Sequence, residues 1–325
     1  MKTVMVTGAL GFVGSALSRR MLAEGVAVIG VDDWSSASPL AGALLQEPGF
    51  MLLDVDLASF NVRDIVRNAA KEHSVETVFH LACPASPIDY FSRPIETLEV
   101  CSTGTQTAAL AALDTHAVLV FTSTSEVYGD PLESPQSEDY WGNVNPTGPR
   151  AAYDEGKRYA EALITAMGRQ LGLKYRIARL FNTYGPGMRA NDGRIVPAII
   201  GSLRSGKPIP IFGNGLQTRS LCFIDDTVSG ILALAASDVS GPMNIGRDDE
   251  NTILEIAGVA ATILNVPLRT ELLPARADDP VRRRPDVSLA RRSLGWEALT
   301  SLPTGISSTI DYFASLDEQA DISLV

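Results

Sequence analysis

The sequence predicts an α/β fold in which a doubly wound parallel sheet is joined to a smaller, interleaved C-terminal substrate domain. Two observations predict the sheet. Short apolar segments alternate with helical stretches as far as about Asn182, and a glycine-rich turn follows the first of those segments. A third observation predicts the smaller domain, because prolines and glycines become frequent after Asn182, as in a loop-rich unit.

The expected strands are short apolar runs, each followed by a turn or a helical stretch. They cover residues 1–6, 26–31, 50–53, 77–81, 117–123 and 175–181. The helices expected between them cover residues 61–71, 94–113 and 150–168. Because the carboxyl ends of parallel strands meet at one edge of a sheet, we expect the functional site at that edge.

The two domains are expected to interleave, because residues 222–237 and 243–245 resemble a return to the sheet. The sheet domain then takes residues 1–182 and about 222–248. The smaller domain takes about 183–221 and 249–315. The acid-containing tail, residues 316–325, is expected to fray.

Composition and charge exclude several classes of function. The 325-residue chain has a formal net charge of −11, which disfavours nucleic acids and anionic membranes as partners. No run approaches the ~18 apolar residues that span a bilayer, and residues 1–18 lack the small-residue cleavage site of a signal peptide. Three cysteines and three histidines are too dispersed for a disulfide framework or a metal site, so we expect a soluble, cytoplasmic protein without a metal.

A glycine-rich turn follows the first expected strand and precedes a helical stretch that ends near Gly25. Strand, turn, helix and second strand form the unit that binds dinucleotides in Rossmann folds. Glycines let the backbone approach a pyrophosphate, and the helix N-terminus offers N–H donors. The residues of this turn expected to bind the cofactor are Gly8, Gly11, Phe12, Val13 and Gly14.

Asp32 ends the second expected strand. Its carboxylate can accept hydrogen bonds from an adenosine ribose and would repel a 2′-phosphate, which favours NAD over NADP as the cofactor. The alternative is a glycine-rich turn without a ligand, and the surrounding strand and helix argue against it.

Tyr153 and Lys157 are four residues apart and therefore share one face of the helix expected over 150–168. A lysine ammonium beside a phenol favours the phenolate, so the pair predicts a tyrosine that acts as a base near neutral pH. The spacing alone is common by chance. Its weight comes from the cofactor turn and from Thr124, which follows an expected strand.

Longer runs of sequence carry a family resemblance. They are 80–87 (HLACPASP), 123–131 (STSEVYGDP), 135–142 (PQSEDYWG), 153–158 (YDEGKR), 181–186 (FNTYGP), 191–194 (NDGR), 217–219 (QTR) and 278–286 (DDPVRRRPD). In these runs the chain resembles the extended short-chain dehydrogenase/reductases that act on nucleotide sugars. Within that group it is similar to the UDP-glucuronate decarboxylases, or UDP-xylose synthases, up to about Phe313.

The tripeptide 124–126, Thr-Ser-Glu, distinguishes branches of this family. Family 4,6-dehydratases carry Thr-Asp-Glu there, with the Asp as acid for water loss, and 4-epimerases lack the Glu. Ser125-Glu126 with Arg283 near the C-terminus therefore resembles the decarboxylases. The catalytic residues that the resemblance implies are Thr124, Ser125, Glu126, Tyr153, Lys157 and Arg283.

The implied reaction begins with oxidation of C4 of UDP-glucuronate by NAD, which creates a β-keto acid that loses CO2. The same bound cofactor then reduces C4 and gives UDP-xylose. Tyr153 would take the C4 hydroxyl proton beside Thr124, and Lys157 would support the phenolate. Glu126 would position a water or pass a proton to C5, and Ser125 and Arg283 would orient the carboxyl end of the sugar.

The resemblance also implies the binding residues. Beyond the glycine turn, those for NAD are Asp32, Asp33, Asp56, Leu57, Leu81, Ala82, Tyr153 and Lys157. Those for the UDP-sugar are Pro84, Tyr90, Asn182, Arg189, Arg194, Phe212, Gln217, Arg219 and Arg283. Arg219 is expected on phosphate, because guanidinium matches phosphate geometry, and Phe212 is expected to stack on uracil. Asp56 is expected to contact adenine or, alternatively, to cap the helix near Asn61.

The sequence departs from the family pattern at a few positions. Cys101 stands where an Asn is usual, Cys83 replaces a Ser, and Cys222 replaces a Gln. Gly187 replaces an Arg, and Arg189 lies two positions further on, where it can substitute for it.

Several alternatives stay open. Glu126 can be a structural acid that caps a loop, and residues 282–284, three arginines, can be a solvated basic run. A UDP-sugar 4-epimerase, a decarboxylase that releases the 4-keto pentose, and a non-catalytic NAD sensor are the competing functions. The Ala- and Leu-rich stretches 94–113 and 150–168 correspond to helices that pair across a two-fold axis in this family, so the resemblance implies a homodimer.

Overall fold

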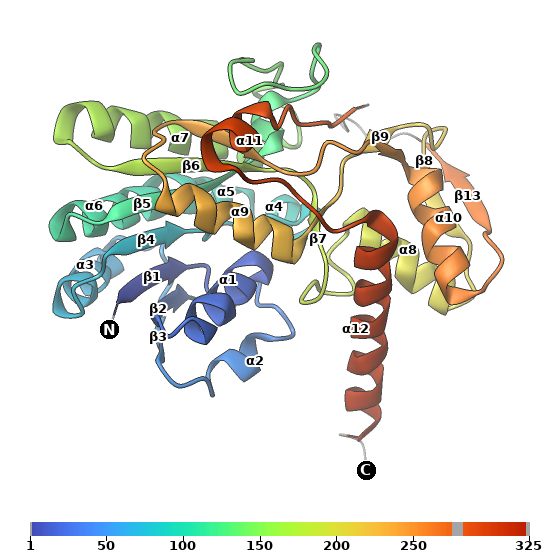
Figure 1. The fold of residues 1–325 in the computed structure, drawn as a ribbon, viewed down its shortest axis with the longest axis horizontal. Helices are drawn as coiled ribbons and strands as arrows, with labels where there is room; N and C mark the ends of the chain where they lie inside the picture. The colour runs from blue at the N-terminus through green and yellow to red at the C-terminus, as the bar shows by residue number, and fades with distance from the viewer. Residues whose placement is uncertain (1, 275–281, 323–325) are drawn as a thin grey trace.

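The computed structural model describes residues 2–274 and 282–322, and its centre is a seven-stranded parallel sheet (Figure 1). The strand order is β11-β6-β5-β4-β1-β2-β3. The strands are β1 (Thr3–Thr7), β2 (Ala27–Asp32), β3 (Phe50–Asp54), β4 (Thr77–His80), β5 (Val118–Thr124), β6 (Tyr175–Leu180) and β11 (Pro242–Ile245).

The order of the strands reverses direction between β1 and β4. From β1 the chain proceeds outward through β2 to β3, and then returns to the other side of β1 at β4. Thr7, the last residue of β1, is in register with Val31 on one side and with His80 on the other. In open α/β sheets this reversal opens a crevice beyond the carboxyl ends of the strands, and ligands bind there.

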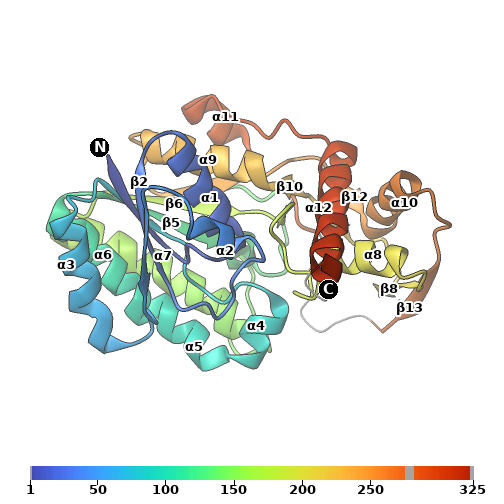
Figure 2. The ribbon, with the colours of Figure 1, turned by 90° about the horizontal axis from the view of Figure 1, so that it is seen from below.

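Helices cover both faces of the sheet because successive strand side chains point to opposite faces. In β1, Val4 and Val6 pack on the side of α1 (Phe12–Ala23) and α9 (Ile224–Ala236). Met5 points to the other side, where α3 (Arg63–Glu72), α6 (Thr105–Thr115) and α7 (Ala151–Leu171) lie. Figure 2 shows the two helical layers on either side of the sheet.

A smaller lobe lies beyond the carboxyl edge of the sheet (Figure 1). Its strands β8 and β13 pair in parallel. The elements of this lobe are α8 (Ile195–Arg204), β8 (Ile209–Phe212), α10 (Ile253–Leu264), β13 (Thr270–Leu273) and α12 (Leu302–Ile322). The remaining short elements are α2 (Ala41–Leu44), η1 (Phe60–Val62), α4 (Pro87–Ser92), η3 (Ser125–Tyr128), β7 (Thr183–Tyr184), β9 (Thr218–Arg219), β10 (Cys222–Phe223), β12 (Asn251–Thr252) and α11 (Ser288–Leu294).

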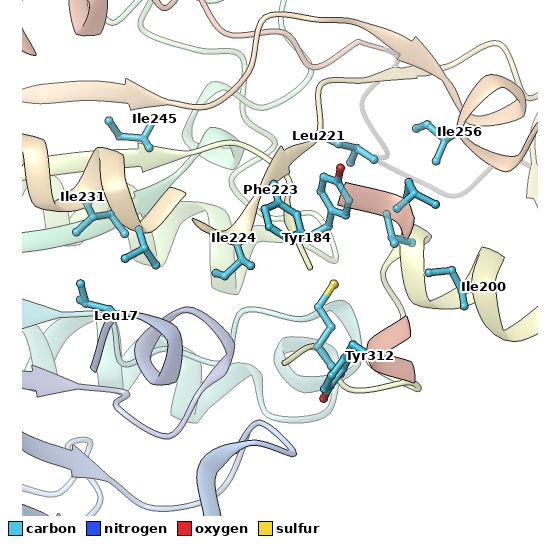
Figure 3. Close-up of a cluster of buried hydrophobic side chains, with 14 of the residues drawn as sticks. Leu17, Tyr184, Ile200, Leu221, Phe223, Ile224, Ile231, Ile245, Ile256 and Tyr312 are labelled. Carbon is cyan, nitrogen blue, oxygen red and sulfur yellow. The ribbon is translucent and has the colours of Figure 1, made fainter. Parts of the chain in front are cut away.

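The two lobes share one hydrophobic core. A cluster of buried side chains runs from Leu17 on α1 through Ile231 on α9 to Ile200 and Ile256 in the smaller lobe (Figure 3). Tyr184 lies between the two ends of this cluster and is 1% exposed. Apolar burial therefore fixes the lobes against each other and gives the cleft between them a defined shape.

Most predicted elements lie within one or two residues of their expected bounds, and α9 and β11 return to the sheet as expected. The helix expected over 94–113 is interrupted. It forms α5 (Pro94–Glu99), a π-helical turn η2 (Val100–Gly104) and then α6. π-Turns of this kind are frequent at functional sites.

Two boundaries differ from expectation. Helix α11 contacts β11 of the sheet, although residues 249–315 were assigned to the smaller domain. The tail that is expected to fray over 316–325 is helical as far as Ile322, and residues 323–325 lie outside the described residues. Leu316 packs against the core, and Asp317 pairs with Arg204 of α8 at 2.5 Å. No helix among residues 2–274 and 282–322 is long and apolar enough to cross a membrane.

Candidate active site

A cleft of about 590 Å³ lies at the carboxyl edge of the sheet, with walls from both lobes. All residues expected to bind the cofactor line it. All residues expected in catalysis or substrate binding line it too, except Arg283, which is 1% exposed and lies behind the wall. The fold therefore gathers residues from distant segments into one place, as the sequence predicts.

The glycine turn leaves no room for side chains where it meets the cleft. Gly8 has φ +69°, and a Cβ atom there would lie 2.8 Å from the backbone nitrogen of Ala82. A Cβ atom on Gly14 would lie 1.9 Å from the carbonyl oxygen of Gly8. Helix α1 begins at Phe12, directly after this turn, with its N-terminus on the cleft. This cradle fits the pyrophosphate of a dinucleotide.

Asp32 lines the cleft near the glycine turn. Its carboxylate accepts hydrogen bonds from the backbone N–H groups of Leu10 and Trp34, each at 2.9 Å. Burial raises the pKa of Asp32, and these two hydrogen bonds partly offset the rise. Asp56 accepts from the N–H of Ala58 at 2.8 Å, so it closes a local turn and also lines the cleft. Its carboxylate does not cap the helix near Asn61, where η1 has Ser59 at its N-cap.

Tyr153 and Lys157 face the cleft from the first turns of α7. The Lys157 ammonium donates to the carbonyl oxygen of Thr122 at 2.8 Å and lies 4.7 Å from the centre of the Phe121 ring. Tyr153 is 7% exposed, hydrogen-bonds with Thr124, and stacks on Tyr90 with ring centres 5.1 Å apart.

Burial is the largest influence on the pKa of Tyr153. Burial raises the pKa of Tyr153 well above its usual value, and the neighbouring Cys83 adds to the rise. The hydrogen bond with Thr124 opposes the rise without cancelling it. Desolvation dominates in this buried site, and Lys157 is not among the main influences on this pKa. The role of Tyr153 as a base stays a prediction.

Glu126 is held by two arginines. Its Oε2 atom accepts hydrogen bonds from Arg150 at 2.7 Å and from Arg283 at 2.8 Å. Arg283 also donates to the carbonyl oxygen of Ser125 at 2.6 Å. Burial alone would raise the pKa of Glu126. The charges of Arg283 and Arg150 lower it by more than burial raises it, so the pKa lies below the usual value. Glu126 is therefore an ionised carboxylate near neutral pH.

Arg283 does not line the cleft itself. The resemblance implied that Arg283, together with Ser125, orients the carboxyl end of the substrate. In the structure Arg283 lies behind Glu126 and Ser125, both of which line the cleft, and it donates one hydrogen bond to each of them. Arg283 therefore contacts the Ser-Glu pair from the side away from the cleft, and because it is buried, residues 282–284 are not only a solvated run.

The expected substrate residues form the opposite part of the wall. Gln217 donates to the carbonyl oxygen of Phe212 at 2.6 Å, which joins the two segments near Arg219. No acceptor among the described residues reaches the buried side-chain amide nitrogen of Asn182, which leaves it available for a ligand. Arg189 is less available, because it forms an ion pair with Asp89 of α4.

Arg150 is the most informative residue that sequence reasoning missed. It precedes the first residue of α7, lines the cleft, pairs with Glu126, and places its guanidinium 5.7 Å from the centre of the Tyr90 ring. Its position could have indicated this, because a residue three positions before Tyr153 lies about one helical turn away, on the same side of the helix. Ser36 and Arg93, which also line the cleft, gave no such signal.

A metal centre finds no support in the described parts of the chain, 2–274 and 282–322. No group of three or more His, Cys, Asp or Glu side chains there is placed to hold an ion. The chemistry of the cleft is that of a tyrosine, a lysine, hydroxyls and an arginine-bound carboxylate.

Known proteins resemble the whole chain. Residues 4–246 match the model of the NAD dependent epimerase/dehydratase family. UDP-glucuronic acid decarboxylase 1 of Danio rerio is 40% identical over 322 residues, which cover 98% of this chain and 75% of the relative. A protein of the same name from Arabidopsis thaliana is 41% identical over 311 residues, covering 95% of this chain and 69% of the relative.

A similar solved structure is UDP-glucuronic acid 4-epimerase of Bacillus cereus in complex with UDP-glucuronic acid and NAD. It has a TM-score of 0.82 and 25% identity, and the match covers 97% of this chain and 99% of the other.

Proposed function

Because the chain belongs to the NAD dependent epimerase/dehydratase family, we propose that it is a UDP-glucuronate decarboxylase that uses tightly bound NAD. It converts UDP-glucuronate to UDP-xylose and CO2. The observation that carries the proposal is the Ser125-Glu126 pair, held from behind by Arg283 in the cleft that contains Tyr153 and Lys157. Relatives with this activity in their names, about 40% identical over nearly the whole chain, support it.

The residues present fit NAD. The cradle of Gly8 and Gly14 would receive the pyrophosphate, and Asp32 would receive the adenosine ribose. When bound, NAD would accept the C4 hydride and return it, and the positive charge of its nicotinamide would lower the pKa of Tyr153.

Tyr153 takes the proton of the C4 hydroxyl, with Thr124 hydrogen-bonded to its phenol. The resulting C4 ketone is β to the sugar carboxylate, so the bond to the carboxyl carbon can break with its electrons delocalised into an enolate. CO2 leaves, and C5 then receives a proton. Finally Tyr153 returns its proton to O4 as C4 is reduced, so the reaction has no net redox change.

Glu126 serves the steps at C5 as a carboxylate. Arg150 and Arg283 keep it ionised, so it has no proton of its own to give near neutral pH. It can instead accept a hydrogen bond from a water and aim that water at C5. This assignment refines the sequence-based alternatives by favouring the positioning of water over direct proton donation.

Identification of the product tests the function. Protein incubated with UDP-glucuronate should release UDP-xylose, recognised by mass spectrometry and NMR. UDP-galacturonate would indicate a 4-epimerase, and a 4-keto pentose would indicate a decarboxylase that omits the last reduction. Recovery of unchanged UDP-glucuronate would favour the non-catalytic NAD sensor.

Asp32→Ala should weaken NAD binding by about 1.5–3 kcal/mol, or roughly ten- to a hundredfold in Kd, because a charged hydrogen bond is lost. Titration calorimetry on protein stripped of its cofactor measures the change. Asp64→Ala, at an exposed position of α3, is the matched control and should bind NAD as wild type does. If wild-type protein prefers NADP to NAD, the role assigned to Asp32 is wrong.

We further propose that the protein is a homodimer. Helices α5 and α7 pack against each other, and exposed apolar side chains gather on α4 and α5. Ile88, Phe91, Ile95 and Leu98 are between 44% and 67% exposed. A concentration of exposed apolar side chains on two neighbouring helices supports an interaction site there.

Light scattering at micromolar concentration should give about twice the 34.7 kDa mass of one chain. Ile95→Glu should reduce the mass to that of one chain without unfolding it, because Ile95 is 67% exposed and a charge in the interface is costly. A wild-type protein that already has the mass of one chain would reject the dimer.

The compartment is inferred from the thiols. Cys83, Cys101 and Cys222 are all free, as in proteins of a reducing compartment, so we propose a cytoplasmic location.

A further inference from the structure

Two cysteines meet in the wall of the cleft. The Sγ atoms of Cys83 and Cys101 are 3.6 Å apart and share a hydrogen bond. Cys83 follows β4 by three residues, and Cys101 lies in the π-helical turn η2, so the fold brings together two separate segments.

The two thiols differ in access. Cys83 lines the cleft, so small molecules that enter it can reach the sulfur. Cys101 is 2% exposed and packs against Gly156 of α7, where a Cβ atom would lie 3.1 Å from its Sγ. A reagent in the cleft can therefore react with Cys83, and the buried Cys101 can then react with Cys83.

We propose that Cys83 and Cys101 form a reversible disulfide when the protein meets a hydroperoxide, which makes this wall of the cleft a site of oxidative modification. The sulfurs must approach by about 1.5 Å to reach the bond length of about 2.05 Å. Loop 81–87 and the π-helical turn must supply this movement. The inference does not depend on the proposed activity, because the disulfide can be detected directly.

The chemistry balances with hydrogen peroxide as the oxidant. The Cys83 thiolate attacks one peroxide oxygen, the O–O bond breaks, and a sulfenic acid and hydroxide form. The Cys101 sulfur then attacks the Cys83 sulfur, the S–O bond breaks, and the S–S bond forms with release of the second oxygen as water. Two thiols lose two electrons and two protons in total, and one peroxide becomes two waters.

The local electrostatics favour Cys83 as the attacking thiol. The hydrogen bond with Cys101 lowers the pKa of Cys83 to about 7, against the effect of burial, so a sizeable fraction is thiolate at neutral pH. The same hydrogen bond and burial raise the pKa of Cys101. Cys222 offers a contrast within the chain, because burial raises its pKa to about 12 and it is fully buried in β10.

The disulfide should reduce catalysis. Cys83 lies between Ala82 and Pro84 in the cleft wall, and Cys101 contacts α7 at Gly156, between Tyr153 and Lys157. A shift of about 1 Å in these supports is enough to cost about a hundredfold in rate. Oxidation should therefore lower activity by roughly ten- to a hundredfold, and a dithiol reductant should restore it.

The experiment treats the folded holoenzyme with a small excess of hydrogen peroxide, then blocks remaining thiols with an alkylating reagent and measures the intact mass. Wild type should retain one alkylated thiol of three, and a peptide map should link Cys83 to Cys101. Cys222→Ser is the matched control and should form the same link. Cys101→Ser should instead yield a Cys83 sulfenic acid that dimedone traps.

Three results would overturn the proposal. One is wild-type protein that keeps three free thiols under conditions that oxidise exposed thiols of a reference protein. Another is oxidation of Cys83 to the sulfinic acid while Cys101 remains free. The third is loss of the link in Cys222→Ser, which would mean that a different pair forms.

Discussion

Tyr153→Phe should slow reduction of the nicotinamide and release of CO2 together, by about 10²–10⁴-fold. The variant keeps the ring that stacks on Tyr90 but removes the oxygen that takes the C4 hydroxyl proton. Loss of a general base costs about 10²–10⁴-fold in the step it serves, and CO2 loss cannot begin until C4 is a ketone. Single-turnover absorbance of reduced nicotinamide, followed beside labelled CO2 from UDP-glucuronate, should show both rates fall by the same factor.

Tyr159→Phe provides the matched control for that prediction. Tyr159 lies on the same helix but is 52% exposed, and its substitution should leave both rates unchanged. A Tyr153→Phe variant that released CO2 at the wild-type rate would show that another group removes the C4 hydroxyl proton.

Substitution of Glu126 should separate the two events that Tyr153→Phe slows together. Glu126→Gln leaves Tyr153 and Lys157 in place, so reduction of the nicotinamide should survive. The steps at C5 should slow by about 10²–10⁴-fold, because the carboxylate that positions the proton-carrying water is gone. The same single-turnover experiment measures both rates, and quenched samples show whether the 4-keto intermediate accumulates.

Stability must be measured alongside, because Glu126 neutralises two arginines in the wall of the cleft. Breaking a buried ion pair by removing one partner typically costs about 3–5 kcal/mol. Glu126→Gln keeps the size and an acceptor oxygen, so it should be less destabilised than Glu126→Ala in thermal unfolding. Glu47→Gln, at an exposed position after α2, is the control and should match wild type in rate and in stability.

The alternative role of Glu126, a structural acid that caps a loop, predicts a different result. If Glu126 only caps the loop at η3, a folded Glu126→Gln variant should release CO2 at the wild-type rate. That result would remove Glu126 from the mechanism. The buried Arg283 would then have only a structural role, as the ion-pair partner of Glu126.

The parallel sheet was predictable because its signals are local. Each strand is an apolar run, and the strand, glycine turn, helix and acid around Gly8, Gly14 and Asp32 follow one another within the first 32 residues. The composition of the cleft was predictable for a related reason. Residues at the ends of adjacent parallel strands must share one edge, whatever the details of their packing.

The contacts inside the cleft were not predictable, because they join segments far apart in the chain and depend on burial. Nothing near Glu126 in the sequence indicates that Arg283, 157 positions away, donates a hydrogen bond to its carboxylate. Nothing near Tyr153 indicates the degree of desolvation that raises its pKa. The ion pair between Arg189 and Asp89 is of the same kind, since it depends on how the lobes dock.

The π-helical turn η2 shows a further limit. Residues 94–113 have the composition of one continuous helix, and the turn appears where Cys101 packs against Gly156 of α7. Helical periodicity describes one segment at a time, whereas this interruption accompanies a contact between two helices. The contact between Cys83 and Cys101 could not be predicted from the sequence for the same reason.

The central claim is that one bound cofactor oxidises C4, allows CO2 to leave, and then reduces the same carbon. The most direct test is a reaction of the purified holoenzyme, with no added NAD, on UDP-glucuronate that carries deuterium at C4. Mass spectrometry and NMR should find UDP-xylose that has lost the mass of CO2 and has kept the deuterium at C4. A product with its carboxylate intact, or UDP-xylose in which the deuterium has been lost, would contradict the account.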